Sequence, residues 1–126
     1  MTKPKVLIID DEYSIRNMMD IILSGQFSML FTTSCKEGFR NAVEEHPDCI
    51  VMDVLFSGKE NGLETCRKIK KDKQTKNIPV IVYSCKRNKD DHIKALNMGV
   101  EGYLEKSRDK DILSAYIRKA INKKSR

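Results

Sequence analysis

The sequence contains no long apolar run and no repeated or low-complexity segment. A helix that spans a membrane needs about 18 or more consecutive apolar residues, and no run in these 126 residues approaches that length. The apolar stretch before Asp10 is also shorter than the core of a secretory signal peptide, about 7–15 residues. We therefore expect neither a membrane-spanning segment nor an export signal, and a cytoplasmic protein.

The sequence also lacks paired cysteines and paired histidines. Its four cysteines stand singly, without a C-x-x-C pair, and His46 and His92 have no partner at the spacing of metal ligands. This pattern argues against a zinc motif and against a disulfide framework. Cys49 and Cys66 lie in apolar segments, which is typical of small buried side chains. Reduced thiols agree with a cytoplasmic location.

The charge balance is basic, with 24 Lys and Arg against 18 Asp and Glu, a net charge of +6. The basic residues gather in 67–76 and 118–126. Such a balance suits nucleic acid or an anionic surface. These stretches nevertheless lack the interleaved aromatic residues of single-strand binders and any helix-turn-helix pattern. We therefore expect a solvated lysine-rich surface that binds neither nucleic acid nor membrane. A nucleic-acid-binding module remains an alternative, which salt-dependent binding to DNA would support.

Short apolar runs alternate along the chain with amphipathic helical patterns. The composition, 40% hydrophobic and 33% charged, is that of one folded domain. Strands are predicted over 5–9, 27–32, 48–52, 78–83 and 102–105. Helices are predicted over 12–23, from Ser34 to Pro47, from Leu63 past Ile69, over 90–98 and over 109–123. This alternation predicts an α/β fold, an open parallel sheet with helices on both faces.

Two helical patterns make more specific predictions about burial. The second helix carries Phe39, Ala42, Val43 and His46 on one face. The last helix is predicted to turn five side chains toward the sheet: Ile112, Leu113, Tyr116, Ile117 and Ala120.

Polar and charged residues follow the predicted strands where each strand ends. They are Asp10 and Asp11, Thr32 and Thr33, Asp53, Ser84, and Lys106. Ligands of open parallel sheets bind beyond these carboxyl ends. Neighbouring strands lie about 5 Å apart, and carboxylates that close repel unless a cation is present. Magnesium suits such a site, because it prefers one or two carboxylates with water and phosphate oxygens.

Four motifs stand at these strand ends: IIDDE at 8–12, IVMD at 50–53, VYS at 82–84 and YLEK at 103–106. Together they resemble the receiver domain of bacterial response regulators, and the resemblance extends from Val6 to about Ile121. It implies a flavodoxin-like, doubly wound, five-stranded parallel sheet of order 2-1-3-4-5. It also implies a single receiver domain over residues 1–126.

The resemblance implies a phosphorelay function for the strand-end residues. Asp53 would accept a phosphoryl group from the phosphohistidine of a histidine kinase or phosphotransfer protein, and a carboxylate is a competent nucleophile for this transfer. Most of the catalysis is then positioning and charge neutralisation. Asp10, Asp11 and Asp53 would bind Mg²⁺ together with the backbone carbonyl of Leu55.

The remaining motif residues are implied to complete a switch. Lys106 would pair with Asp53 before the reaction and with phosphate after it, and the Ser84 hydroxyl would bond the phosphoryl group. Tyr103 would be the aromatic switch residue that swings inward; a strand aromatic packed on the surface is the alternative. The fourth helix, fifth strand and fifth helix would form the face that regulates a protein partner or supports a homodimer.

Two departures from the family pattern affect the backbone near the site. Ser107 stands where the family commonly has a proline after a cis bond. A cis bond costs about 3–4 kcal/mol before a non-proline residue against about 0.5–1 kcal/mol before proline. We therefore expect either a strained cis Lys106–Ser107 bond or a trans bond with Lys106 rearranged. In the loop after Asp53, Ser57 replaces a proline and Gly62 stands one position later than usual, which predicts a longer, more mobile loop.

A third departure concerns the residues around the phosphoryl group. Leu55, Cys85 and Lys86 include none that obviously orients an attacking water. We therefore expect a long-lived acyl phosphate on a self-phosphorylating acceptor with slow autodephosphorylation, which is not a conventional turnover enzyme.

Three alternatives remain beside this interpretation. One is a degenerate receiver that binds proteins without phosphate. Another is an FMN carrier of the same architecture, although the acidic DDEYS segment after the first strand would repel its phosphate. The third concerns the extent of the protein. We expect a stand-alone regulator, because a DNA-binding output domain would need some 60 further residues; the alternative is that the sequence is a fragment of a longer protein.

Overall fold

The computed structural model describes the chain except for residues 1, 24, 55, 57–60, 86–88 and 125–126. Five parallel strands form one sheet of order β2-β1-β3-β4-β5, which confirms the predicted fold class. The strands are β1 (Lys5–Ile9), β2 (Ser28–Thr32), β3 (Cys49–Met52), β4 (Val80–Ser84) and β5 (Gly102–Glu105). The helices are α1 (Tyr13–Ile22), α2 (Cys35–Glu45), α3 (Gly62–Lys71), α4 (Lys89–Asn97) and α5 (Leu113–Lys124).

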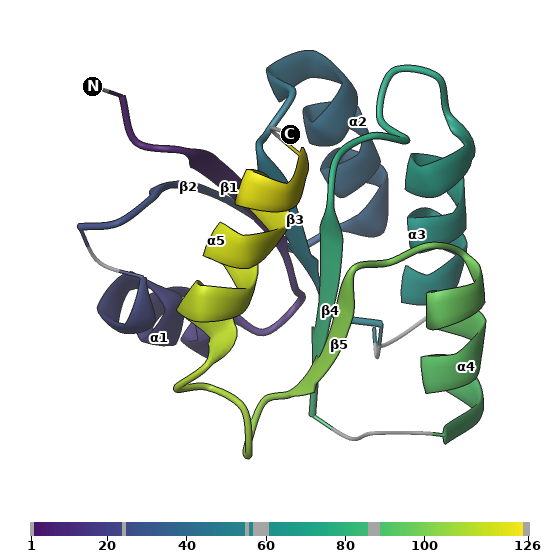
Figure 1. Cartoon of the computed structure of the whole chain (residues 1–126). Coiled ribbons are helices and arrows are strands. Elements are labelled where there is room, and N and C mark those ends of the chain that lie inside the picture. The colour runs from purple at the N-terminus through teal and green to yellow at the C-terminus, as the bar shows by residue number, and fades with distance from the viewer. Residues whose placement is uncertain (1, 24, 55, 57–60, 86–88, 125–126) are drawn as a thin grey trace.

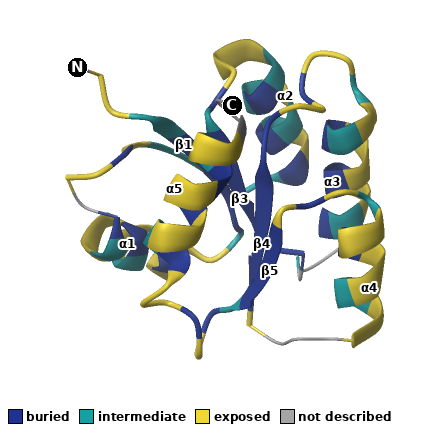
Figure 2. Ribbon diagram, in the orientation of Figure 1, coloured by how far each residue is buried: buried dark blue, intermediate teal, exposed yellow. Residues whose placement is uncertain are grey.

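The helices form two layers, with α1 and α5 on one face of the sheet and α2, α3 and α4 on the other (Figure 1). Alternate side chains of a strand point to opposite faces, so β1 contributes Leu7 and Ile9 to one core and Val6 and Ile8 to the other. The strands β3 and β4 are buried along their whole length, as Figure 2 shows. Continuous apolar runs are expected where both faces of a parallel sheet are covered.

Polar side chains define where two of the helices begin. The Ser34 hydroxyl accepts the amide of Glu37 at the start of α2. The Asn61 side chain accepts the amides of Leu63 and Glu64 at the start of α3. Each cap satisfies amides that have no partner within the helix. These two caps stabilise the first turns of α2 and α3.

The start of the last helix was predicted four residues too early. Asp109 is buried, and its carboxylate accepts the amide of Glu105 at 2.8 Å and pairs with Arg108. These bonds hold a turn between β5 and α5, so the helix begins at Leu113.

The predicted inward faces were also partly wrong. Leu113, Ile117 and Ala120 are buried, but Ile112 and Tyr116 are 43% and 39% exposed. The Tyr116 ring lies over the outer edge of the sheet, 3.2 Å from where a Cβ atom would stand at Gly102. His46 is exposed, because it leaves α2 in the left-handed conformation at φ 47°.

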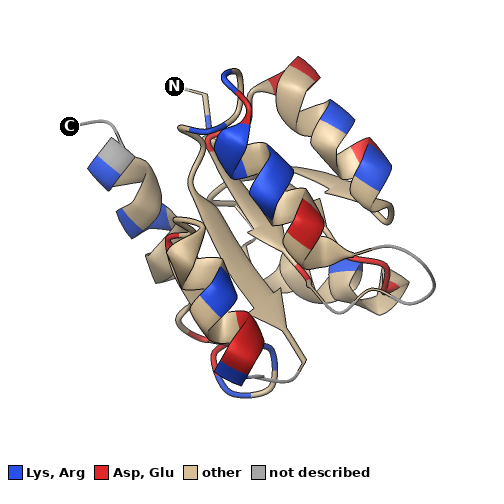
Figure 3. Cartoon of the chain, turned by 90° about the vertical axis from the view of Figure 1, so that its right-hand side faces the viewer, with Lys and Arg blue, Asp and Glu red and all other residues tan. Residues whose placement is uncertain are grey.

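The charged residues lie mainly on the outer surface of the helices (Figure 3). The last turn of α3 carries Lys68, Lys70 and Lys71, where cations interact favourably with the helix dipole. No helix among the described residues is both long enough and apolar enough to cross a membrane.

Candidate functional site

The register of the sheet brings the predicted site residues to one edge. Ile9 of β1 pairs with Met52 of β3, so the next residues, Asp10 and Asp53, emerge side by side. The Asp53 amide donates to the Ile9 carbonyl at 2.9 Å, and the Lys106 amide donates to the Ser84 carbonyl at 2.8 Å. In these four neighbouring strands the apolar runs end at the same level, so the polar residues that follow them lie close together.

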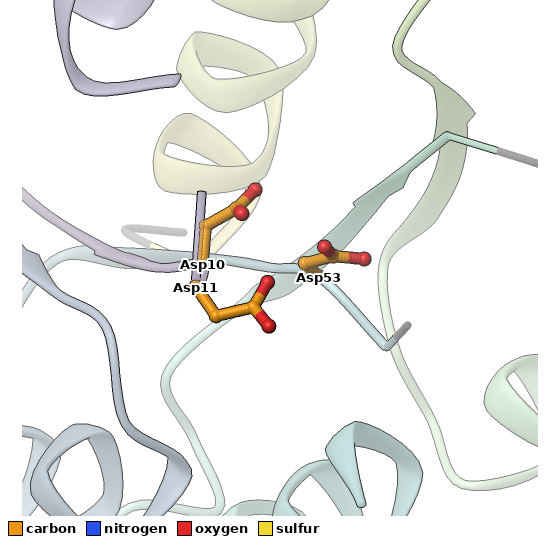
Figure 4. A group of neighbouring side chains, drawn as sticks. All are labelled: Asp10, Asp11 and Asp53. Carbon is orange, nitrogen blue, oxygen red and sulfur yellow. The ribbon is translucent and has the colours of Figure 1, made fainter. Parts of the chain in front are cut away.

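Three carboxylates form a cluster at this edge (Figure 4). Asp10, Asp11 and Asp53 each offer an oxygen atom, and these atoms lie within 4.8 Å of one another. Asp10 and Asp53 are each only 2% exposed, while Asp11 is half-buried. Hard oxygen ligands at this spacing fit a divalent cation such as Mg²⁺. The expected fourth ligand, the carbonyl of Leu55, lies outside the described residues, as does Lys86.

The ammonium group of Lys106 enters the same cluster from the end of β5. Its nitrogen lies 2.7 Å from Asp10 Oδ2, 3.2 Å from Glu12 Oε1 and 3.3 Å from Asp53 Oδ2. Burial alone would lower the pKa of Lys106, but the hydrogen bond and charge of Asp10 and the charge of Asp53 raise it above its ordinary value. The lysine therefore stays charged and partly neutralises the carboxylates.

The carboxyl group of Asp10 is strongly affected by its surroundings. Burial raises its pKa from 3.8 to about 6, although hydrogen bonds from Lys106 and from the amide of Glu12 oppose the rise. The charge of Asp53 raises it further. In the metal-free protein, Asp10 thus ionises close to neutral pH, and a bound cation would favour its charged form.

Both oxygens of Asp53 have partners from neighbouring strands. The Ser84 hydroxyl donates to Oδ1 at 3.0 Å, and Lys106 donates to Oδ2 at 3.3 Å. The Tyr83 hydroxyl donates to the Lys106 carbonyl at 3.3 Å, which anchors the lysine backbone behind the site. Asp53 is thus held in one orientation by a hydroxyl and an ammonium group.

The bond between Lys106 and Ser107 is trans, as are the other peptide bonds of the described residues. Of the two expectations for this bond, the cis form is wrong. The displacement of Lys106 that we expected with a trans bond is not seen either, because the side chain reaches Asp53. Lys106 therefore reaches Asp53 without a cis bond and without the proline of the family pattern.

Tyr103 is buried, and its ring stacks on that of His92 in α4, with centroids 4.9 Å apart and an angle of 27° between the planes. Tyr103 is therefore packed inward rather than on the surface, and its role as a switch residue stays a prediction. No role for His92 could be predicted, since a single histidine on a polar helical turn carries no recognisable signal.

Sequence reasoning also missed one neighbour of Lys106, the carboxylate of Glu12. Glu12 lies within the IIDDE motif and contacts the ammonium group. Cys85 is exposed, with its sulfur 3.5 Å from Glu12 Oε1. A longer carboxylate directly after two aspartates is the signal that could have pointed to Glu12.

Comparison with known proteins places this site in context. The family model described as "Response regulator receiver domain" matches residues 6–118. The chain is 31% identical over 107 residues to the phosphate regulon transcriptional regulatory protein PhoB of Pseudomonas aeruginosa, covering 84% of this chain and 46% of PhoB. It is 31% identical over 106 residues to the polar-differentiation response regulator DivK of Brucella ovis, covering 84% of this chain and 85% of DivK.

The fold is similar to that of solved receiver domains. The CheY-like response regulator receiver domain protein from Methanospirillum hungatei superposes with a TM-score of 0.88, at 18% identity and with 98% of each chain covered. The chain spans about half the length of the first curated relatives that it matches.

Proposed function

We propose that this chain, which belongs to the response regulator receiver domain family, is the phospho-accepting switch of a two-component phosphorelay. The observation that carries the proposal is the environment of Asp53. Ser84 and Lys106 hold one oxygen each, and Asp10 and Asp11 stand beside it. This arrangement combines a buried nucleophile, a fixed cation and the oxygen ligands of a metal ion.

The proposed reaction transfers a phosphoryl group to Asp53. A carboxylate oxygen of Asp53 forms a bond to phosphorus, while the bond between phosphorus and the histidine nitrogen of the donor breaks. The nitrogen keeps the electron pair and leaves as imidazole, and the product is an aspartyl phosphate. The donor is a histidine kinase or a phosphotransfer protein, and the chain is a self-phosphorylating acceptor without conventional turnover.

Charge neutralisation supplies most of the catalysis in such a transfer. Lys106 is poised to balance the charge on the phosphoryl oxygens, and the Ser84 hydroxyl can turn from Asp53 to one of them. Asp10, Asp11 and Asp53, together with the Leu55 carbonyl, would hold Mg²⁺, which would supply further positive charge to the transfer. A metal-assisted transfer is therefore the chemistry that this donor set supports.

The proposed readout is a change on the face formed by α4, β5 and α5. Ser84 is the last residue of β4, and Lys106 directly follows β5. A phosphoryl group that bonds both residues would therefore act at the edge of this face. Tyr103 lies within it against His92. Apolar side chains remain exposed on α4 (Ile93 and Leu96), on α5 (Tyr116) and directly before α5 (Ile112). They suit a protein partner or a second copy of the chain.

Two further parts of the proposal follow from the sequence. Residues 1–126 act as one receiver domain in the cytoplasm. The acyl phosphate is long-lived, because Leu55, Cys85 and Lys86 include no residue that obviously orients an attacking water. An aspartyl phosphate half-life of seconds in the isolated protein would contradict this second part.

Intact mass spectrometry tests the central claim. The wild type and Asp53→Asn are incubated with Mg²⁺ and a small phosphodonor, and circular dichroism checks that both are folded. We expect the wild type alone to gain one phosphoryl group. No gain in either folded protein would instead support a degenerate receiver that binds its partner without phosphate.

A further inference from the structure

Glu12 occupies the N-cap position of α1, but its side chain makes no capping hydrogen bond. Helices prefer a short polar side chain at this position. The Glu12 carboxylate turns away from the helix and reaches Lys106 Nζ at 3.2 Å and Cys85 Sγ at 3.5 Å. It therefore joins residues that follow three different strands, and its position is explained by the site rather than by the helix.

Glu12 is also the exposed member of the carboxylates around Lys106. Asp10 and Asp53 are buried, whereas the Glu12 side chain is 46% exposed. Cys85, its second contact, is exposed as well. These two residues form the solvent-facing rim of the site, beside the lysine that is proposed to balance the charge of the phosphoryl group on Asp53.

Glu12 contributes one negative charge to the net charge of the whole site. When ionised, Asp10, Asp11, Glu12 and Asp53 supply four negative charges against the single positive charge of Lys106. A divalent cation reduces the excess from three negative charges to one. The site with a divalent cation therefore keeps one net negative charge, and without the charge of Glu12 it would be neutral.

Resting on the proposed phosphoryl transfer, we infer that Glu12 is a specificity-determining residue for the phosphodonor. Its negative charge repels small donors that carry two negative charges, and it competes with the incoming phosphoryl group for the ammonium of Lys106. Donors whose nitrogen leaving group is protonated, on the nitrogen bonded to phosphorus in phosphoramidate or on the other ring nitrogen in phosphohistidine, carry a compensating positive charge and are repelled less. The site thus discriminates between acyl phosphates and N-phosphoryl compounds, the class that includes phosphohistidine.

Two small donors separate these classes. With acetyl phosphate, Asp53 forms its bond to phosphorus as the bond to the acetyl oxygen breaks, and acetate leaves with the electron pair. With phosphoramidate, the phosphorus–nitrogen bond breaks, and the nitrogen, already protonated, leaves as ammonia. At neutral pH acetyl phosphate carries two negative charges, and phosphoramidate carries one net negative charge.

The experiment measures the initial rate of Asp53 phosphorylation by intact mass, with saturating Mg²⁺ and low ionic strength. It compares the wild type with Glu12→Gln, which removes the charge, and Glu12→Asp, which keeps it. Glu44→Gln, an exposed change on α2, serves as the matched control. Because Glu12 lies beside the reacting groups, removing its charge should increase the rate of Asp53 phosphorylation about tenfold with acetyl phosphate and about threefold with phosphoramidate. Glu12→Asp and Glu44→Gln should retain the wild-type ratio of the two rates.

A second measurement reports on the contact itself. Burial raises the pKa of the Cys85 thiol, the charge of Lys106 lowers it, and the charge and hydrogen bond of Glu12 raise it. In the absence of any phosphodonor or metal, Glu12→Gln should therefore accelerate alkylation of Cys85 by iodoacetamide, and Glu44→Gln should not.

The possible results distinguish the role of Glu12 from the proposed phosphorylation of Asp53. Phosphorylation of the wild type and of Glu12→Gln at equal rates would overturn the role of Glu12 and leave the proposed function standing. A slower reaction of Glu12→Gln with both donors would also overturn it, because Glu12 would then assist transfer. No phosphorylation of Asp53 in any folded variant would overturn the proposed function and the role of Glu12 together.

Discussion

The ammonium nitrogen of Lys106 lies closer to Asp10, at 2.7 Å, than to any other carboxylate that it contacts. This pair joins the first and last strand ends of the site, far apart in the sequence. In the metal-free protein Lys106 thus supplies the positive charge that Asp10 needs in its buried position. A cation bound at the same carboxylates and the lysine therefore contribute to the same electrostatic balance.

The first prediction concerns Lys106→Met. Removal of the ammonium leaves buried carboxylates without compensation, and breaking a buried ion pair from one side costs about 3–5 kcal/mol. We expect the free energy of unfolding in EDTA to fall by about this amount, and excess Mg²⁺ to restore part of it by binding the folded state. Urea denaturation with EDTA and with Mg²⁺ measures both effects.

Lys94→Met is the control for this prediction. Lys94 is an exposed lysine of α4, and its replacement should change stability by less than about 0.5 kcal/mol. If Lys106→Met were as stable in EDTA as the wild type, the ion pair would make no net contribution to folding.

The second prediction concerns the pH dependence of stability without metal. Asp10 ionises near 3.8 in the unfolded chain and near 6 in the folded one. Between these values the folded state binds more protons than the unfolded state, so the free energy of unfolding falls as pH rises. The rise of this pKa from 3.8 to about 6 corresponds to about 3 kcal/mol. We expect this contribution to stability to be lost between about pH 4 and 6 and the free energy of unfolding to stay constant above.

Urea denaturation in EDTA from pH 4 to 8 measures this loss. Asp10→Asn cannot ionise and should lack the decline, whereas Asp20→Asn, an exposed change on α1, should retain it. The same decline in Asp10→Asn would show that another group causes the pH dependence.

Much of this fold was predictable because the strands are apolar on both faces. Runs such as CIVM and VIVYS are buried along their whole length, and the point where each run ends sets the position of the polar residue that follows. Asp10, Asp53, Ser84 and Lys106 could therefore be assigned to one edge. The strand order 2-1-3-4-5 came from the family resemblance, because periodicity within a strand does not determine its neighbours.

The errors arose where side-chain bonds or packing between elements decide the structure. The start of α5 depends on Asp109, which folds back to the amide of Glu105. The stacking of His92 on Tyr103 joins a helix to a strand, and the contact of Glu12 with Lys106 joins residues 94 positions apart. No local sequence pattern encodes these contacts.

The third prediction concerns Gly62, the first residue of α3. A Cβ atom there would stand 2.4 Å from the Cα atom of Val54 and 2.6 Å from the carbonyl oxygen of Asp53. Gly62→Ala must therefore displace the backbone that carries the proposed acceptor. We expect a loss of about 1–3 kcal/mol in stability, as for other overpacked sites, together with slower phosphorylation of Asp53.

Denaturation and the intact-mass assay measure these two effects. Glu64→Ala, an exposed change in the same helical turn, should alter stability by no more than about 0.5 kcal/mol. A Gly62→Ala protein with wild-type stability and rate would mean that α3 can move away without disturbing Asp53.

The fourth prediction concerns Lys70 at the opposite edge of the sheet. Its side chain is 9% exposed, donates to the Ile78 carbonyl at 3.0 Å and lies 3.4 Å from Glu101, which in turn accepts the amide of Val80 at 2.6 Å. The lysine thus ties α3 to the start of β4 and β5. Lys70→Met should lower the free energy of unfolding by about 1.5–3 kcal/mol, as expected for hydrogen bonds to charged groups.

A double-mutant cycle with Glu101→Gln separates this contact from general effects of charge. The two residues touch, so their replacements should show a coupling energy of at least about 0.5 kcal/mol. Lys71→Met, an exposed neighbour on α3, should combine additively with Glu101→Gln. Additive losses for Lys70→Met as well would mean that Lys70 stabilises the fold through the Ile78 carbonyl alone. Since this network lies far from Asp53, each variant should be phosphorylated at the wild-type rate while folded.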